Sequence, residues 1–185
     1  MVIGGDEDDE VLKIGTAIIP FQSHLSKKRF LAATTPKNQS LWVTGGKDAS
    51  FKDSKLKSTD IIQRDGTIVV GPELPLALCQ HAIVEIQPDE TYMLIGGNTD
   101  DAFASKATFV YHARIGKWTK GPDLLQGRYA HSAGVLHDIA THHPYTVVVG
   151  GLQNDGSELL PVEFLRSGSL RWTEGKHILH SYILN

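Results

Sequence analysis

The segment YTVVVGGLQNDGS, residues 145–157, contains a β-branched run that stops at two adjacent glycines. Branched side chains pack well on a pleated surface, so residues 147–149 predict a buried strand. Glycine adopts positive φ without steric penalty and lets another backbone approach closely. Gly150 and Gly151 therefore predict a sharp exit from that strand. The same pattern recurs elsewhere in the chain, and its recurrence decides the fold.

Glycine pairs occur along the whole chain, each after a short apolar run. Successive pairs are 41, 51 and 54 residues apart, and periods of this size are typical of repeat architectures. The pairs are Gly4 and Gly5, Gly45 and Gly46, Gly96 and Gly97, and Gly150 and Gly151. We infer that the chain repeats one structural unit.

Tryptophan and glycine keep a common register in the later repeats. Trp118 and Trp172 open the phrases WTKGPDL and WTEGKHI, each with a glycine three residues on, at Gly121 and Gly175. The earlier phrase IVVGPEL has Ile68 and Gly71 in those places. An apolar or aromatic residue stands seven positions before each phrase: Tyr111, Leu165 and Ile61.

A second register connects leucine with histidine. Leu74 and Leu124 each stand seven residues before a histidine, His81 and His131. The first repeat follows this spacing less closely. Leu25 is followed by Arg29 and then by Ala32, and Arg29 matches Arg128. A repeated position predicts a structural role, since a catalytic group has no need to recur.

Double glycine, then an aromatic residue, then tryptophan about seven residues later resembles the kelch repeat. The resemblance covers nearly the whole chain and implies an all-β, kelch-type β-propeller of four-stranded antiparallel blades. Strands separated by turn signals predict an all-β fold independently. We expect one propeller unit over residues 1–185. Its blades, called repeats 1 to 4 below, span about 1–28 (partial), 29–76, 77–126 and 127–178, with 179–185 a tail or the start of a further blade.

Three complete blades and a partial one leave unpaired strand edges, which pair readily with another chain. Three arrangements account for those edges. The sequence is a fragment of a longer kelch protein; or SYIL, residues 181–184, closes a four-bladed ring beside residues 1–4; or two copies form a homodimer through their open edges.

The loops after the glycine pairs are the predicted binding surface, because in kelch proteins they help form one face of the disc, and loops on a rigid scaffold often carry binding residues. The loop at 47–57 is rich in lysine, whereas those at 6–10, 98–106 and 152–160 are net acidic. The candidate partner-binding residues are Lys47, Asp48, Lys52, Asp53, Asn98, Asp100, Asp101, Asn154, Asp155 and Glu158.

Two groups of reactive side chains are interpreted as structural. The segment HDIATHHP, residues 137–144, offers His137, Asp138, His142 and His143, but adjacent histidines rarely face one ion, so we expect a solvated loop. Cys79 and His81 lack an implied third orienting group, so we expect Cys79 to be a buried small residue at a blade junction. We expect no catalytic residue, metal or cofactor.

Composition narrows the function classes. The net charge is −3, which provides no basic field for nucleic acid, and no apolar stretch approaches the length of a membrane span. A single cysteine and the acidic segment DEDDE at 6–10, where a secretory signal would lie, favour a cytoplasmic protein.

The kelch resemblance implies a non-enzymatic protein–protein interaction module, as in ubiquitin-ligase substrate adaptors or actin-associated kelch proteins. The alternative is a kelch-fold enzyme resembling galactose oxidase or sialic acid mutarotase. The oxidase site needs a tyrosine linked to a cysteine together with histidine ligands, and the one cysteine here has no evident tyrosine partner.

Overall fold

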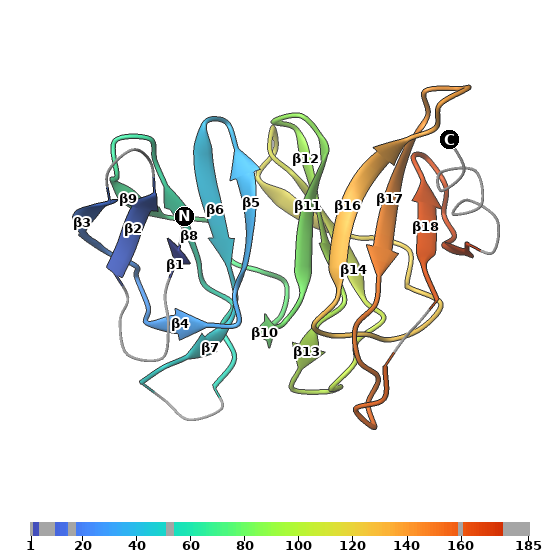
Figure 1. Cartoon of the computed structure of the whole chain (residues 1–185), viewed down its shortest axis with the longest axis horizontal. Helices are drawn as coiled ribbons and strands as arrows, with labels where there is room; N and C mark the ends of the chain where they lie inside the picture. Colours follow the sequence, from blue (N-terminus) through green and yellow to red (C-terminus); the bar gives the residue numbers. More distant parts are fainter. Residues whose placement is uncertain (1, 4–9, 15–17, 51–53, 159–160, 176–185) are drawn as a thin grey trace. The chain divides into compact units, whose positions relative to one another are not determined.

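The computed structural model is an all-β protein (Figure 1). It describes residues 2–3, 10–14, 18–50, 54–158 and 161–175, and these contain no helix, hence none long and apolar enough to cross a membrane. The chain divides into two compact units, Met1–Gln80 and His81–Asn185. The prediction of an all-β fold is confirmed.

The first unit contains repeats 1 and 2. Repeat 1 is an antiparallel three-stranded sheet of β1 (Val2–Ile3), β2 (Glu10–Ile14) and β3 (Ile18–His24). Repeat 2 is an antiparallel four-stranded sheet, in the order β5 (Ala33–Lys37), β6 (Ser40–Thr44), β8 (Thr59–Ile62) and β9 (Ile68–Val70). Short strands β4 (Arg29–Phe30) and β7 (Lys47–Asp48) pair with each other, and β10 (Leu78–Cys79) ends the unit.

The second unit contains the sheets of repeats 3 and 4, both antiparallel. Repeat 3 has the order β11 (Ala82–Gln87), β12 (Thr91–Ile95), β14 (Thr108–His112) and β15 (Lys117–Lys120), with the short strand β13 (Asn98–Thr99) after β12. Repeat 4 has the order β16 (Ser132–His137), β17 (Pro144–Val149), β18 (Glu163–Arg166) and β19 (Thr173–Glu174). The predicted four-stranded antiparallel sheets of repeats 2, 3 and 4 are confirmed.

The glycine of each tryptophan phrase occupies the same place in its sheet. The backbone N–H groups of Gly71, Gly121 and Gly175 each donate over 2.9 Å, to the carbonyl oxygens of Thr59, Thr108 and Val162. These bonds confirm that the phrase IVVGPEL is equivalent to WTKGPDL and WTEGKHI.

The seven-residue spacing seen in the sequence corresponds to strand pairing in repeat 3 but not in repeat 2. Trp118 lies opposite Tyr111 in β14–β15, but Ile68 lies opposite Ile62 in β8–β9, and not opposite Ile61. The paired residues Ile62 and Ile68 are six positions apart, whereas Tyr111 and Trp118 are seven apart, so equal sequence spacing does not give equal pairing.

The two tryptophans stabilise the second unit in different ways. Trp172 is 2% exposed, belongs to a core cluster with Leu124 and Val148, and donates its indole N–H to the carbonyl oxygen of Pro122 over 2.9 Å. Trp118 is half-buried and packs on Tyr111, with ring centroids 5.1 Å apart. Large aromatic surfaces of this kind contribute strongly to the packing of small sheets.

The glycine pairs share one backbone conformation. The second glycine has a φ of 100° at Gly46, 98° at Gly97 and 96° at Gly151, a region that residues with a Cβ rarely adopt. The backbone N–H of this second glycine donates to a carbonyl oxygen in the connection toward the next repeat. Gly46 donates to Leu78 over 2.9 Å, and Gly97 donates to Arg128 over 2.8 Å. Thus the pairs end a strand and also hold that connection; Gly4 and Gly5 lie outside the described residues.

Candidate functional site

The predicted binding loops of the second unit lie at one end of their sheets. In Figure 1 the loops after β12 and β17 lie at the end opposite the β11–β12 and β16–β17 turns. Five predicted side chains are exposed there, namely Asp100, Asp101, Asn154, Asp155 and Glu158. The structure thus places these residues on the surface, and their binding of a partner stays a prediction.

Other predicted loop residues are placed differently. Asp48 and Asn98 are each only 6% exposed, and the Asp48 carboxylate accepts a hydrogen bond from the Ser50 backbone over 2.8 Å. Lys47 is half-buried, while Lys52 and Asp53 lie outside the described residues. Asp48 therefore shapes its loop.

A hollow of about 400 Å³ lies between the loops of repeats 3 and 4. It is lined by Ala104 and Lys106 of repeat 3, by residues 125–127 of the connection, and by residues 153–155 of repeat 4. The side-chain oxygen of Asn154 accepts a hydrogen bond from the Ala104 backbone over 2.7 Å. This contact joins the two loops across 50 residues of sequence.

The residues that line the hollow and the loop of repeat 3 that contributes to it carry negative charge and exposed apolar side chains. The Ser157 hydroxyl and backbone N–H both donate to the Asp155 carboxylate and lower its pKa, so the group is ionised at neutral pH. Phe103, in the loop of repeat 3, is 65% exposed, and Leu125 in the lining is 44% exposed. Exposed aromatic and aliphatic side chains beside charged groups are typical of protein-binding surfaces.

A buried ion pair holds the connection that lines the hollow. Arg128 and Glu163 are 0% and 1% exposed and 2.7 Å apart. The Glu163 carboxylate also accepts hydrogen bonds from the backbones of Leu125, over 2.7 Å, and Gln126, over 3.1 Å. Arg128 donates further to the carbonyl oxygen of Gly150 over 2.8 Å. The pair therefore fixes the lining backbone against the sheet of repeat 4.

Repeat 2 contains an equivalent buried ion pair. Arg29 and Asp60 are equally buried and 2.8 Å apart, and Asp60 accepts a hydrogen bond from the Ser26 backbone over 3.1 Å. Asp60 directly follows Thr59, and Glu163 directly follows Val162, the residues whose carbonyl oxygens accept the equivalent glycine bonds. Phe109, which follows Thr108, is the matching residue in repeat 3. The position that matches the two arginines in repeat 3 is Leu78.

The ion pairs were missed from sequence, although a signal was present. Arg29 matches Arg128 in the sequence, but the acids stand 31 and 35 residues later, each followed by two apolar residues of a strand. A carboxylate that is buried beside apolar strand residues requires a partner, and the matched arginines are cations that could supply it.

The two repeated histidines are buried, as a structural role requires. Burial lowers the pKa of His81 to about 3, with a smaller contribution from His131. Burial also lowers the pKa of His131 to about 4, and the Arg128 charge acts in the same direction. Both imidazoles are therefore neutral in the folded protein at neutral pH.

We expect acid to destabilise the protein through these histidines. Unfolded histidine takes up a proton near pH 6.5, whereas the folded groups stay neutral until about pH 4 and 3. The contribution of these histidines to the free energy of unfolding is therefore complete above about pH 6.5. It decreases as the pH drops toward 4, by about 1.4 kcal/mol per pH unit for each histidine. Urea denaturation at several pH values measures this slope.

The matched variant is His131→Ala, since Ala32 occupies the equivalent position in repeat 2. It is expected to lower the slope by the contribution of one histidine, whatever its effect on stability at pH 7. An unchanged slope in this variant would show that the acid sensitivity comes from other groups.

The remaining reactive side chains have structural surroundings. Within the described residues, no group of three or more histidine, cysteine, aspartate or glutamate side chains could hold a metal ion. The Asp138 carboxylate accepts hydrogen bonds from the backbones of Ala140, over 3.0 Å, and Thr141, over 2.7 Å, and so caps its own turn. Cys79 is fully buried, as predicted.

Comparisons with known proteins leave the family open. No model of a known protein family matches the chain, and no curated protein sequence is significantly similar to it. Membership of the kelch family therefore stays a prediction from the repeat pattern.

Proposed function

We propose that the protein is a kelch-type β-propeller and a non-enzymatic binding module. Its glycine-pair loops present one face to a protein partner, as in cytoplasmic ubiquitin-ligase substrate adaptors or actin-associated kelch proteins. The observation that carries the proposal is the hollow between the loops of two successive repeats, lined in part by the predicted residues Asn154 and Asp155. The repeated sheets and glycine registers support the propeller.

The loops are held in a defined geometry, which favours binding because less freedom is lost when a partner docks. The Asn154 side chain joins them, and the Arg128–Glu163 pair fixes the connection beneath. Such support from rigid strands is typical of loops that bind.

The charges of the glycine-pair loops of repeats 3 and 4 favour a partner with a cationic surface. Asp100, Asp101, Asp155 and Glu158 are exposed around the loops, and Lys106 is the cation of the lining. Complementary charge accelerates encounter and selects partners, while Phe103 offers an apolar anchor.

Charge reversal on the loop tests the proposal. The variant Asp100→Lys with Asp101→Lys is expected to reduce partner recovery in proximity labelling at least tenfold, because it opposes a cationic partner. The matched control is Asp89→Lys with Glu90→Lys, an adjacent acidic pair in the turn at the other end of the same sheet. Equal partner recovery by the wild type and the loop variant, or selective loss in the control, would contradict the proposal.

A further inference from the structure

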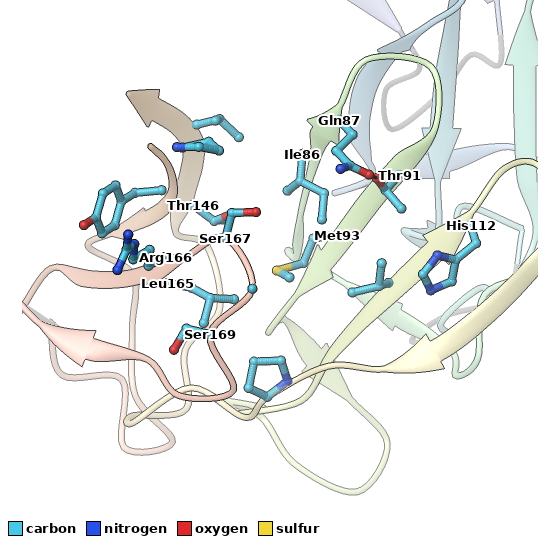
Figure 2. A pocket seen from close by; sticks show the side chains of 16 residues that line it. Ile86, Gln87, Thr91, Met93, His112, Thr146, Leu165, Arg166, Ser167 and Ser169 are labelled. Atoms are coloured by element: carbon cyan, nitrogen blue, oxygen red, sulfur yellow. Dashed lines mark hydrogen bonds between the residues drawn. The ribbon is translucent and has the colours of Figure 1, made fainter. Parts of the chain in front are cut away.

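A second cavity lies between the sheets of repeats 3 and 4, and it is separate from the loop hollow. Its volume is about 270 Å³, and its walls come from β11, β12 and β14 on one side and from β16, β17 and β18 on the other. Figure 2 shows Ile86 and Met93 facing Leu165 and Ser167 across this space. We call it the inter-sheet cleft.

The body of the inter-sheet cleft is apolar. Met93 and Leu165 form part of the buried core cluster, and Ile86 and Val110 pack against that cluster. An engineered apolar cavity of roughly 150 Å³ accepts benzene. The inter-sheet cleft therefore has room for a flat body of about two fused rings.

One hydroxyl in the lining of the inter-sheet cleft, that of Thr146, makes no hydrogen bond to another described residue. The residue Thr146 is 6% exposed and lines the cleft. Its hydroxyl makes no hydrogen bond within the described part of the chain. A hydroxyl group both donates and accepts hydrogen bonds, so the Thr146 hydroxyl is available to a ligand in the cleft. The Ser167 hydroxyl, from another residue of the lining, also has no such bond there, although the Ser167 backbone N–H donates to the Pro144 carbonyl oxygen over 3.0 Å.

The polar groups of the cleft favour an uncharged ligand. Arg166 is the one charged residue of the lining, and Figure 2 shows its side chain directed away from Met93 and the space between the walls. An ionised ligand would lose its hydration without gaining a partner of opposite charge. A hydroxyl on the ligand, in contrast, both donates and accepts, as Thr146 and Ser167 require.

We propose that the inter-sheet cleft binds a small uncharged molecule with a flat apolar body and one hydroxyl group. The apolar body lies between Met93 and Leu165, and the ligand hydroxyl bonds with Thr146 and Ser167. This site is independent of the proposed loop surface, so either one can fail without the other.

Methyl NMR tests the site with 2-naphthol as the probe. The chain has two methionines, Met1 and Met93, so methyl-labelled methionine gives one resonance inside the cleft and one reference. Addition of 2-naphthol is expected to move the Met93 signal upfield in a saturable manner, because an aromatic ring lies against it. The charged analogue 2-naphthoate is expected to bind at least tenfold more weakly.

Two variants separate the hydroxyl contact from simple hydrophobic binding. Thr146→Val keeps the side-chain shape and is expected to weaken 2-naphthol binding about 3- to 10-fold; Ser167→Ala, at an exposed turn position, is expected to weaken it less. Thr173→Val, an exposed threonine of the same sheet outside the lining, serves as the control and should leave the affinity unchanged. Absence of a saturable Met93 shift, equal affinity for naphthoate, or equal affinity in the folded Thr146→Val variant would overturn the proposal.

Discussion

Replacing Arg128 by leucine is expected to lower the free energy of unfolding by about 3–5 kcal/mol, because Glu163 is left as a buried charge without its cation. The substitution also removes the donor to the Gly150 carbonyl oxygen. Chemical denaturation in urea, with coincident fluorescence and circular dichroism transitions, measures the loss. Arg171→Leu, at an exposed arginine of the same repeat, is the control and is expected to change stability by less than about 0.5 kcal/mol.

The chain itself indicates which second substitution compensates. Repeat 3 has Leu78 and Phe109 at the two positions that Arg128 and Glu163 occupy in repeat 4. We therefore expect the double variant Arg128→Leu with Glu163→Phe to recover about half or more of the loss, since apolar groups replace a buried pair well when both charges are removed. A double variant no more stable than Arg128→Leu alone would show that the two repeats do not share this junction.

Replacing Gly151 by alanine is expected to lower the free energy of unfolding by about 2–4 kcal/mol. Gly151 has a φ of 96°, and an added Cβ would lie 2.8 Å from the Tyr129 carbonyl oxygen. Backbone strain and contact with another backbone act together, and a backbone atom cannot swing aside as a flexible side chain does. Thermal and urea denaturation give the size of the loss.

Two other glycines of repeat 4 separate these causes. Gly156→Ala meets the strain of a positive φ, 79°, but has nothing within 4 Å of the added Cβ, so a loss of about 1 kcal/mol is expected. Gly134→Ala in β16 meets open space at an ordinary φ and is expected to have little effect. If Gly151→Ala cost no more than Gly156→Ala, close approach of the Tyr129 backbone would not be what requires glycine there.

The strands of repeats 3 and 4 could be predicted from sequence because their signals are local. The phrase TYMLIGG predicts a strand that stops at glycine, and the structure has β12 ending at Ile95, directly before Gly96. The phrase HSAGVLH likewise corresponds to β16. Positive φ at the glycine pairs follows from the same local chemistry.

Features that depend on partners far along the chain could not be predicted in this way. Ile62, and not Ile61, lies opposite Ile68, because these paired residues are six positions apart and not seven as in the pair Tyr111 and Trp118. The bond between Asn154 and Ala104 joins loops of different repeats, and the place of Thr146 in the lining of the inter-sheet cleft depends on how two sheets face each other. Such contacts need the register of the sheets before they can be named.

Hydrogen–deuterium exchange of the protein bound to its recovered partner tests the central claim most directly. The proposal predicts slower amide exchange within residues 98–106 and 152–158, with little change in the turns at 88–90 and 139–142 at the other end of the same sheets. Protection confined to those opposite turns, with the glycine-pair loops unchanged, would contradict the binding surface proposed for this protein.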